Sequence, residues 1–184
     1  MSMQIMSAAL MELGEEGIGS LKEDSELVRI MSVFYETERD AMLEEHPWNF
    51  ALRRVELAEQ VSGAAFGYAR AFQLPSDALC VVDVEPEQNF ELEGQSLLTD
   101  SPHVFLRYVR RIRHAKALPP TFRSALAARL AARVAKKITG SSAEKERMEV
   151  LYRERLRTAK SRDAQGGGRP APQRPHAFIS ARES

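Results

Sequence analysis

Apolar residues follow two different periods along the chain, and the change between them separates helical segments from strand-like ones. They recur at helical spacing over residues 3–13, 25–44, 121–139 and 142–163, which predicts four amphipathic helices. Over residues 48–109 the period is closer to two, and turn-forming residues separate short apolar runs, as in strands. We therefore expect an α+β fold: a bundle of about four helices with a small antiparallel β-sheet, followed by an extended C-terminal tail.

The helical segments carry recognisable faces and ends. In the second helix, the predicted apolar stripe consists of Leu27, Ile30, Met31, Phe34, Ala41 and Met42. The predicted polar surface of that helix is supplied by Glu36, Glu38, Arg39 and Asp40. Thr121 is the expected N-cap of the third helix, and Gly140 is its expected C-cap. Ser141 and Glu144 have the spacing of a capping box, which predicts the start of the fourth helix.

The middle of the chain predicts a hairpin and further short strands. Residues 90–93 and 96–99 flank Gly94-Gln95, a pair suited to a tight turn. The apolar run at residues 79–84 is typical of a buried strand, and residues 68–72 alternate as an edge strand does. Several short strands with close turns favour antiparallel pairing.

The only tryptophan lies where the helical pattern gives way to the strand-like one. Pro47 disfavours a helical conformation at His46. Trp48 and Phe50 are two positions apart, so on a strand they would point to the same face. Two large rings on one face are enough to anchor a core, and such rings are usually buried. We expect Trp48 and Phe50 to be core anchors; a ligand-binding aromatic platform is the alternative.

The formal net charge of zero hides a division between the two halves of the chain. Residues 1–100 hold 6 Lys/Arg and 20 Asp/Glu, whereas residues 101–184 hold 20 Lys/Arg and 6 Asp/Glu. Such asymmetry concerns partners rather than fold. One interpretation is that the two halves neutralise each other within one subunit. A second is that the acidic half of one subunit meets the basic half of the next, and a third is that the basic half faces nucleic acid. All three interpretations stay open at this point.

Motifs for catalysis or metal binding are missing from the sequence. Cys80 is the single cysteine, which excludes an intramolecular disulfide and a cysteine-based zinc site. There is no phosphate-binding loop or nucleophile motif, and the four histidines lack metal-ligand spacing. The sequence contains no run of 18 apolar residues, so it predicts no membrane span. Residues 1–13 do not have the pattern of a secretory signal. We therefore expect a structural or binding protein that is made in a cytoplasm-like compartment.

The segment 164–184 differs in composition from the domain expected over residues 1–163. Glycines at positions 166–168 precede three prolines, and this composition buries too little apolar area to order by itself. Phe178 and Ile179 are unexpected in a purely solvating tail. The tail is therefore either an inert chain terminus or a tether that carries a docking peptide.

A series of short motifs also occurs in a definite order, and the order is more specific than any one motif. The motifs are Leu13-Gly14, His46-Pro47-Trp48-Asn49-Phe50-Ala51, residues 68–72 with Leu74-Pro75-Ser76-Asp77, Val81-Val82-Asp83-Val84, Phe90-Glu91-Leu92-Glu93-Gly94, Leu97-Leu98-Thr99-Asp100, Leu106-Arg107-Tyr108-Val109 and Leu118-Pro119-Pro120-Thr121-Phe122, followed by a helix that ends in Ile138-Thr139-Gly140. In this order and spacing, residues 3–163 resemble the tail tubular protein A family of short-tailed bacteriophages, the adaptor that joins the head to the tail.

The resemblance implies a structural virion protein without a cofactor and without enzymatic activity. It implies a ring, usually of twelve copies, between the portal protein and the distal tail (nozzle) protein. Double-stranded DNA would pass through the ring without sequence-specific binding, and tail fibres are a further candidate partner. The resemblance places the protein at the head–tail interface of the virion, after assembly in the host cytoplasm.

Under this hypothesis, two sets of residues are candidates for contacts with partners. Charges at subunit contacts would come from the acidic second helix and from the basic last two helices, namely Glu36, Asp40, Glu44, Arg129, Arg133, Arg153 and Arg157. Phe178 and Ile179 would dock on the portal protein. One alternative function is nucleic-acid binding through the arginines of residues 147–162, and another is a cell-wall-active virion enzyme.

Overall fold

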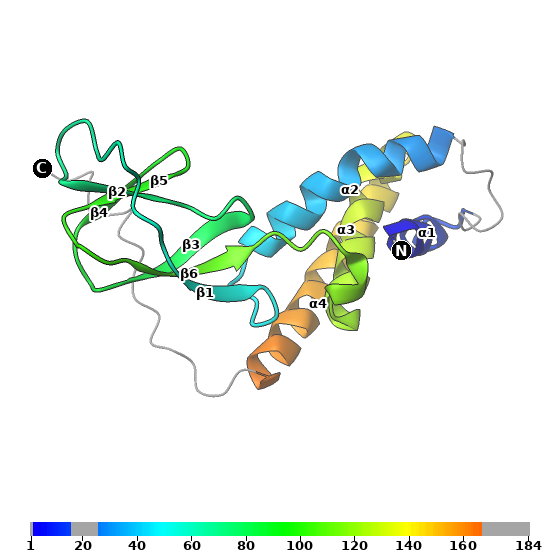
Figure 1. Ribbon diagram of the computed structural model, residues 1–184. Coiled ribbons are helices and arrows are strands. Elements are labelled where there is room, and N and C mark those ends of the chain that lie inside the picture. The colour runs from blue at the N-terminus through cyan, green and yellow to red at the C-terminus, as the bar shows by residue number, and fades with distance from the viewer. Residues whose placement is uncertain (1, 16–25, 167–184) are drawn as a thin grey trace, which may run out of the picture.

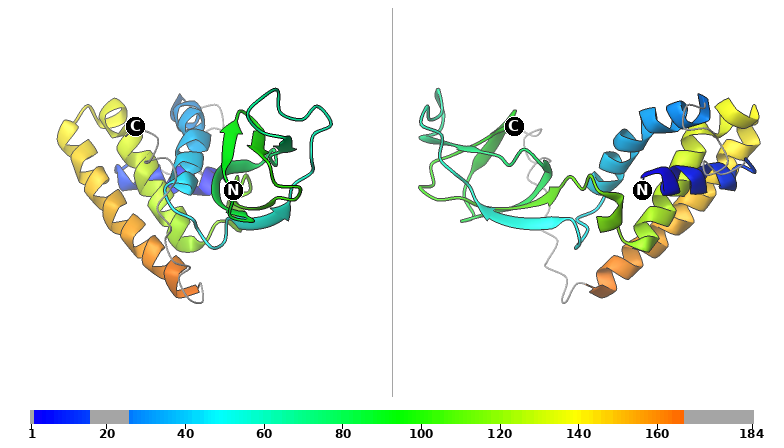
Figure 2. Two further views of the ribbon diagram at one scale, coloured as in Figure 1. Left: turned by 90° about the vertical axis from the view of Figure 1, so that its left-hand side faces the viewer. Right: turned by 45° about the vertical axis from the view of Figure 1, so that its right-hand side comes forward.

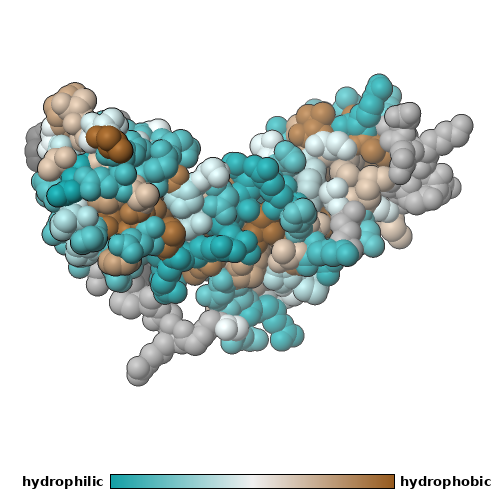
Figure 3. Space-filling view, viewed as in Figure 1, coloured by the Kyte–Doolittle hydropathy of each residue, from teal (hydrophilic) through white to brown (hydrophobic). Residues whose placement is uncertain are grey.

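The computed structural model describes residues 2–15 and 26–166, which form an elongated molecule with helices at one end and strands at the other (Figure 1; Figure 2). The elements in chain order are α1 (Ser2–Glu12), α2 (Glu26–Glu44), β1 (Leu52–Glu56), β2 (Arg70–Gln73), β3 (Ala78–Glu85), β4 (Phe90–Glu93), β5 (Ser96–Thr99), β6 (Phe105–Arg110), η1 (Ala115–Ala117), α3 (Pro120–Thr139) and α4 (Ser142–Gly166). We call the four α-helices the helical body and residues 52–110 the β half. Figure 3 shows that the surface is hollowed between them. The α+β prediction is confirmed.

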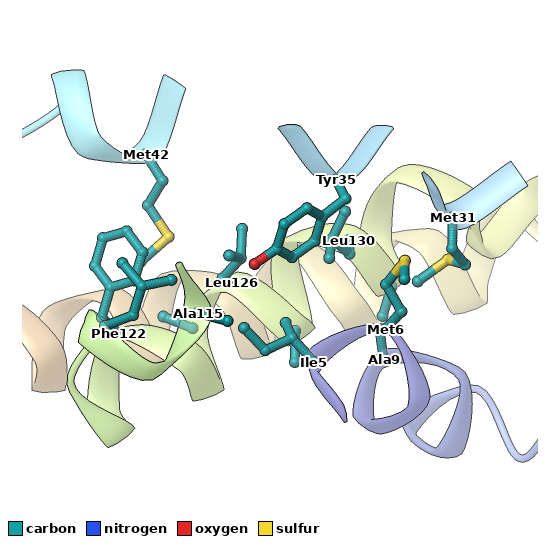
Figure 4. Packing of buried hydrophobic residues seen from close by; sticks show 14 of the residues in the cluster. Ile5, Met6, Ala9, Met31, Tyr35, Met42, Ala115, Phe122, Leu126 and Leu130 are labelled. Atoms are coloured by element: carbon teal, nitrogen blue, oxygen red, sulfur yellow. The ribbon is translucent and has the colours of Figure 1, made fainter. Parts of the chain in front are cut away.

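Helix α3 is the centre of the helical body, because α1, α2 and α4 all pack against it (Figure 1). Its alanine-rich face is buried at Ala125, Ala128, Ala132 and Ala135. Small side chains on this face let the neighbouring helices approach closely. Figure 4 shows apolar side chains of α1, α2 and α3 meeting in one core.

The ends of α3 and α4 show where local sequence decides structure. Gly140 has a φ of 72° and ends α3 in the left-handed conformation that favours glycine, as predicted. The hydroxyl of Ser141 accepts a hydrogen bond from the backbone of Glu144 at 3.2 Å, as in a capping box. The prediction of Thr121 as N-cap is wrong: Pro119 is the N-cap and Pro120 is the first helical residue. Proline fits there because its fixed φ suits a first helical turn that needs no N–H donor.

The buried stripe of α2 differs from the predicted one. Its buried positions are Val28, Met31, Tyr35, Arg39, Met42 and Leu43, whereas Leu27, Ile30 and Phe34 are only half-buried at its edge. Arg39, predicted to be surface, is 2% exposed. Its guanidinium contacts the Asp40 carboxylate at 2.8 Å and lies 5.8 Å from the centre of the Tyr35 ring. The charged Arg39 side chain can be buried here because the Asp40 carboxylate pairs with it.

The β half contains two antiparallel three-stranded sheets, not the single small sheet predicted. Their strand orders are β1-β6-β3 and β2-β5-β4. The predicted hairpin is present as β4 and β5, with Phe90 opposite Thr99 and Gly94 at a φ of 57° in the turn. The prediction of a buried strand at residues 79–84 is wrong, because β3 is an edge strand whose residues are mostly half-buried.

The β half has its own core and is joined to the helical body through β1 and β6. Side chains between the two sheets form a second apolar cluster around Phe72, Leu97 and Leu106. Strands β1 and β6 pair with each other, and the N–H of Arg110 donates to the carbonyl of Ala51 at 2.9 Å where they meet the helices. Both connections between the two halves therefore run side by side.

Candidate functional site

A cluster of hydrogen-bonded and charged side chains joins α2 to α3 and α4 through Arg129. Arg129 Nε donates to Glu38 Oε2 at 2.6 Å, and its Nη1 donates to the Tyr152 hydroxyl at 2.6 Å and to Glu45. The Tyr152 hydroxyl in turn donates to Glu45 Oε2 at 2.9 Å. Arg133 adds a looser contact, 3.4 Å from Glu38. We call this set the Arg129 network.

Burial and charge act in different directions on the two titratable groups at the centre of the Arg129 network. Burial raises the pKa of Tyr152 to about 12, although the Arg129 charge acts against the shift. Burial alone would lower the pKa of Arg129, but hydrogen bonds to Glu38 and Glu45 raise it above the ordinary value. Arg129 therefore stays charged and Tyr152 stays protonated over the whole physiological range of pH.

A second ion-pair cluster connects α2 to the segment after β6. The Asp40 carboxylate accepts hydrogen bonds from Arg39 and from Arg111, each at 2.8 Å. These residues line a polar cleft of about 450 Å³ together with Glu36 and Arg113. The cluster fixes the helical body to the chain segment that leaves the β half.

These two clusters include three of the seven charged residues that were predicted to lie at subunit contacts. Asp40, Arg129 and Arg133 form ion pairs within one chain, so the acidic and basic halves neutralise each other in part inside the subunit. The other four predicted charges, which are exposed, are Glu36, Glu44, Arg153 and Arg157. None of these four takes part in an ion pair among residues 2–15 and 26–166.

Trp48 is buried at the joint between the two halves, but it does not lie on the predicted strand. The expectation of a strand through Trp48 and Phe50 is wrong, because both belong to a turn in which the Trp48 carbonyl accepts from the N–H groups of Ala51 and Leu52. The turn still brings the rings together, with centres 5.8 Å apart. Trp48 is 1% exposed, and its indole N–H donates to the Met42 carbonyl at 2.9 Å. Its role as a core anchor therefore follows from burial in the structure.

The last turns of α4 hold this aromatic turn in place through Asp163. Both carboxylate oxygens of Asp163 accept from the backbone N–H of Asn49, at 3.0 and 3.1 Å. The side-chain amide of Asn49 donates to the Asp163 carbonyl at 2.8 Å. His46 Nε2 lies 3.6 Å from the same carboxylate. We call this set the Asp163 clamp.

Beside the Asp163 clamp, the aromatic turn leaves an open apolar groove. Its volume is about 260 Å³, and apolar side chains supply most of its walls: Trp48, Phe50, Pro119, Phe122 and Ala159. The ring of Phe122 stands edge-on to Trp48, with centres 5.0 Å apart. Arg162 and Asp163 lie at the rim. We call this surface the apolar groove.

His46 is expected to make the stability of the fold depend on pH. Burial lowers the pKa of His46 from its ordinary value of 6.5, although the Asp163 carboxylate partly opposes the shift. The unfolded chain therefore takes up this proton at a higher pH than the folded chain does, so the free energy of unfolding falls as the pH decreases below about 6.5. Urea unfolding on either side of this value should show a smaller decrease for His46→Gln than for the native chain.

The matched control is His103→Gln, because the side chain of His103 is 72% exposed on the β half. This variant should keep the pH dependence of the native chain. An unchanged pH dependence in His46→Gln would contradict the assignment.

The remaining predicted features fall outside these clusters. Phe178 and Ile179 lie outside the described residues. Burial raises the pKa of the half-buried Cys80 thiol, which disfavours the reactive thiolate form. Among the described residues, no group of three or more His, Cys, Asp or Glu could hold a metal ion. Within the same residues, no helix has the length and apolar character needed to cross a membrane.

Three residues that organise these clusters were missed by the sequence analysis: Arg39, Tyr152 and Asp163. Arg39 has the spacing of the buried stripe of α2, which is a usable signal. Asp163 and Asn49 are 114 positions apart in the chain, and no local pattern indicates that they meet.

Comparisons with known proteins do not assign the chain to a family. No protein-family model matches it, and no curated protein is significantly similar to it in sequence. The hypothesis about function therefore depends on the sequence motifs and on the geometry described above.

Proposed function

We propose that this chain is a structural head-to-tail adaptor in the virion of a short-tailed bacteriophage. Copies of the chain form a ring, twelve by analogy with the tail tubular protein A family, between the portal protein and the nozzle protein. The ring surrounds the DNA channel and is assembled in the host cytoplasm. The chain acts through its surfaces rather than through catalysis.

The observation that carries the proposal is the contact between two of the family-like motifs. Trp48 belongs to the motif at residues 46–51, and Phe122 belongs to the motif at residues 118–122. The two motifs are far apart in sequence, yet these rings pack at 5.0 Å where the helical body meets the β half. This packing supports the interpretation of the ordered motifs as parts of one structural unit.

The shape and the exposed charges also support an assembly role. The helical body and the β half lie at opposite ends of an elongated molecule (Figure 1), so different patches are available to different neighbours. Contacts between unlike patches of identical subunits generate closed rings when the rotation closes. Glu36 and Glu44 on α2 and Arg153 and Arg157 on α4 are exposed and have no ion-pair partner among the described residues, so they are the remaining candidates for subunit contacts.

Electron microscopy of the purified protein with the portal protein of the same phage tests the function directly. A closed ring of this chain on the portal, coaxial with its channel, is the expected result. Particles in which the portal stays bare at saturating concentrations of the chain would exclude the adaptor function.

Truncation after Gly168 is expected to weaken attachment to the portal protein while the helical body and the β half stay folded. The reason is that Phe178 and Ile179 are the large apolar residues of the tail, and apolar anchors supply much of the affinity of a docking peptide. Binding to immobilised portal protein measures the effect, and circular dichroism checks the fold.

A full-length variant with Phe178→Ala and Ile179→Ala separates these side chains from the rest of the tail. Arg182→Ala is the matched control, since it changes a charged residue of the same tail. Equal portal affinity for the native chain and the double variant would remove the tail from the proposal.

Nucleic-acid binding is the second candidate, and the exposed arginines of α4 favour it. Arg153, Arg157 and Arg162 are exposed on this helix. However, Arg147 pairs with Glu144 and Arg155 pairs with Glu12, which reduces the positive charge available for phosphates. Filter binding of double-stranded DNA at moderate salt separates the two functions, because an adaptor that lets DNA pass should bind it weakly.

A further inference from the structure

The loop between β1 and β2 has an apolar tip at the end of the β half that is farthest from the helices (Figure 1; Figure 2). In this loop the Phe66 side chain is 85% exposed and Val61 is fully exposed. Figure 3 shows apolar atoms gathered at this tip, at the upper left of the view. Large apolar side chains exposed on one projecting loop indicate a contact with another molecule.

The backbone of this loop is shaped to present the tip. Gly63 and Gly67 have φ values of 60° and 82°, a conformation that glycine adopts without steric cost. The Asp100 carboxylate accepts from the backbone N–H of Ala69 at 2.8 Å, which fixes the base of the loop. Phe66 is therefore held outward on a defined loop.

The apolar groove described above is the complementary feature, and it lies at the joint between the helical body and the β half. It is bounded by the start of α3, the end of α4 and the turn that precedes β1. In Figure 1, the loop tip lies on the far side of the β half from the start of α3 and the end of α4, the helix ends that bound the groove. A contact between the tip and the groove must therefore join two molecules.

The charges beside the two surfaces have opposite signs. The β half, residues 52–110, holds five arginines and nine carboxylates. Glu91 and Asp100 lie near the base of the loop, where they add to the effect of burial in raising the pKa of Tyr68. On the last turns of α4, Arg162 lines the groove, and Lys160 lies close enough to the adjoining His46 to act on its pKa. The single carboxylate at the rim, Asp163, is already engaged by Asn49.

We propose that Phe66 of one copy of this chain enters the apolar groove of a second copy, while the acidic base of the loop faces the basic end of α4. The contact joins unlike surfaces, so it leaves a free loop on one copy and a free groove on the other, and it propagates into a ring or a filament. The inference rests on the proposed function in one respect: the proposed ring is the closed assembly that repeated copies of this contact form.

Two variants test the contact from its two sides. Phe66→Ser removes the apolar tip from an exposed position, so the fold should be kept. Thr121→Glu places a carboxylate in the groove, at the start of α3, where a negative charge favours the helix. Each variant should weaken self-association by about 10- to 100-fold, which corresponds to the loss of one buried phenylalanine contact.

Mixing the two variants gives the sharpest result. Phe66→Ser keeps an intact groove, and Thr121→Glu keeps an intact loop, so an equimolar mixture should form dimers that cannot extend. Sedimentation velocity should show higher oligomers for the native chain, monomers for each variant alone and dimers for the mixture. Val33→Ser is the matched control, because Val33 is 70% exposed on α2, outside both surfaces, and it should associate as the native chain does.

Several outcomes would overturn the contact. They are a native chain that stays monomeric at its highest soluble concentration, a Phe66→Ser variant that associates as the native chain does, and a mixture that shows no dimer. Failure of the adaptor function is a separate result: the loop–groove dimer would persist in the mixture while the native chain leaves the portal bare.

Discussion

Replacing Trp48 by alanine is expected to lower the free energy of unfolding by about 3–5 kcal/mol, the usual effect of truncating a large buried ring. Trp48 is 1% exposed and packs against Phe122. Its removal leaves a cavity where α2, α3 and the turn before β1 meet. Urea unfolding followed by circular dichroism measures the change; tryptophan fluorescence cannot be used, because Trp48 is the only tryptophan.

Trp48→Phe is the matched control, since it keeps an aromatic ring but loses the hydrogen bond from the indole to Met42. This variant should lower the free energy of unfolding by about 1–3 kcal/mol, because the Met42 carbonyl loses its donor and the ring is smaller. The proposed ring assembly should fail in Trp48→Ala through loss of folded protein, and it should recover in Trp48→Phe. A folded Trp48→Ala of native stability would show that the joint is held by other contacts.

Arg129→Met is expected to destabilise the helical body by about 2–4 kcal/mol, somewhat less than the removal of one partner from a fully buried ion pair. The side chain of Arg129 is 19% exposed and that of Glu38 is 13% exposed, so water screens the pair only in part. Without Arg129, the carboxylates of Glu38 and Glu45 face each other and the Tyr152 hydroxyl with no cation at the centre. Denaturant unfolding measures the loss.

Arg133→Met is the matched control on the same helix. Its side chain is 58% exposed and lies 3.4 Å from Glu38, so its removal should cost less than about 1 kcal/mol, as for other exposed pairs. Adding Glu38→Gln and Glu45→Gln to Arg129→Met should recover part of the loss, because the uncompensated charges are then gone. Equal effects of Arg129→Met and Arg133→Met would contradict a central role for Arg129.

Local sequence predicted the elements of this fold well where a single residue or a strict period decides. Gly140 ends α3 because its φ is positive, and the two-residue loop at Gly94 closes the predicted hairpin. The bounds of the four helices lie within about three residues of those expected from the spacing of apolar positions. These features depend on neighbouring residues alone.

The failures have a common physical reason, which is tertiary context. Arg39 is buried because Asp40 and the Tyr35 ring lie beside it, and polarity alone had placed it on the surface. The strand at residues 79–84 is only half-buried because it forms the edge of its sheet. Trp48 and Phe50 meet across a turn that Asp163 holds from the far end of the chain.

The candidate surfaces depend even more on such distant pairs. Arg129 and Glu45 are 84 positions apart, and sequence alone left open whether the two charged halves pair within one subunit. The Arg129 network and the ion pair between Asp40 and Arg111 place several of these pairs inside one chain. The apolar groove has walls from three separate segments, so no single stretch of the sequence predicts it.

The position of the β half between α2 and α3 has a consequence for how the chain folds as it is made. Synthesis begins at the N-terminus, so α1 and α2 leave the ribosome before the helix on which they pack. The β half is continuous in sequence, has its own core and closes through β1 and β6, so it is complete before α3 emerges. Throughout that interval the apolar side chains of α2, Met31 and Met42 among them, have no α3 to cover them. During this period the nascent chain exposes an amphipathic helix whose apolar face a chaperone can bind.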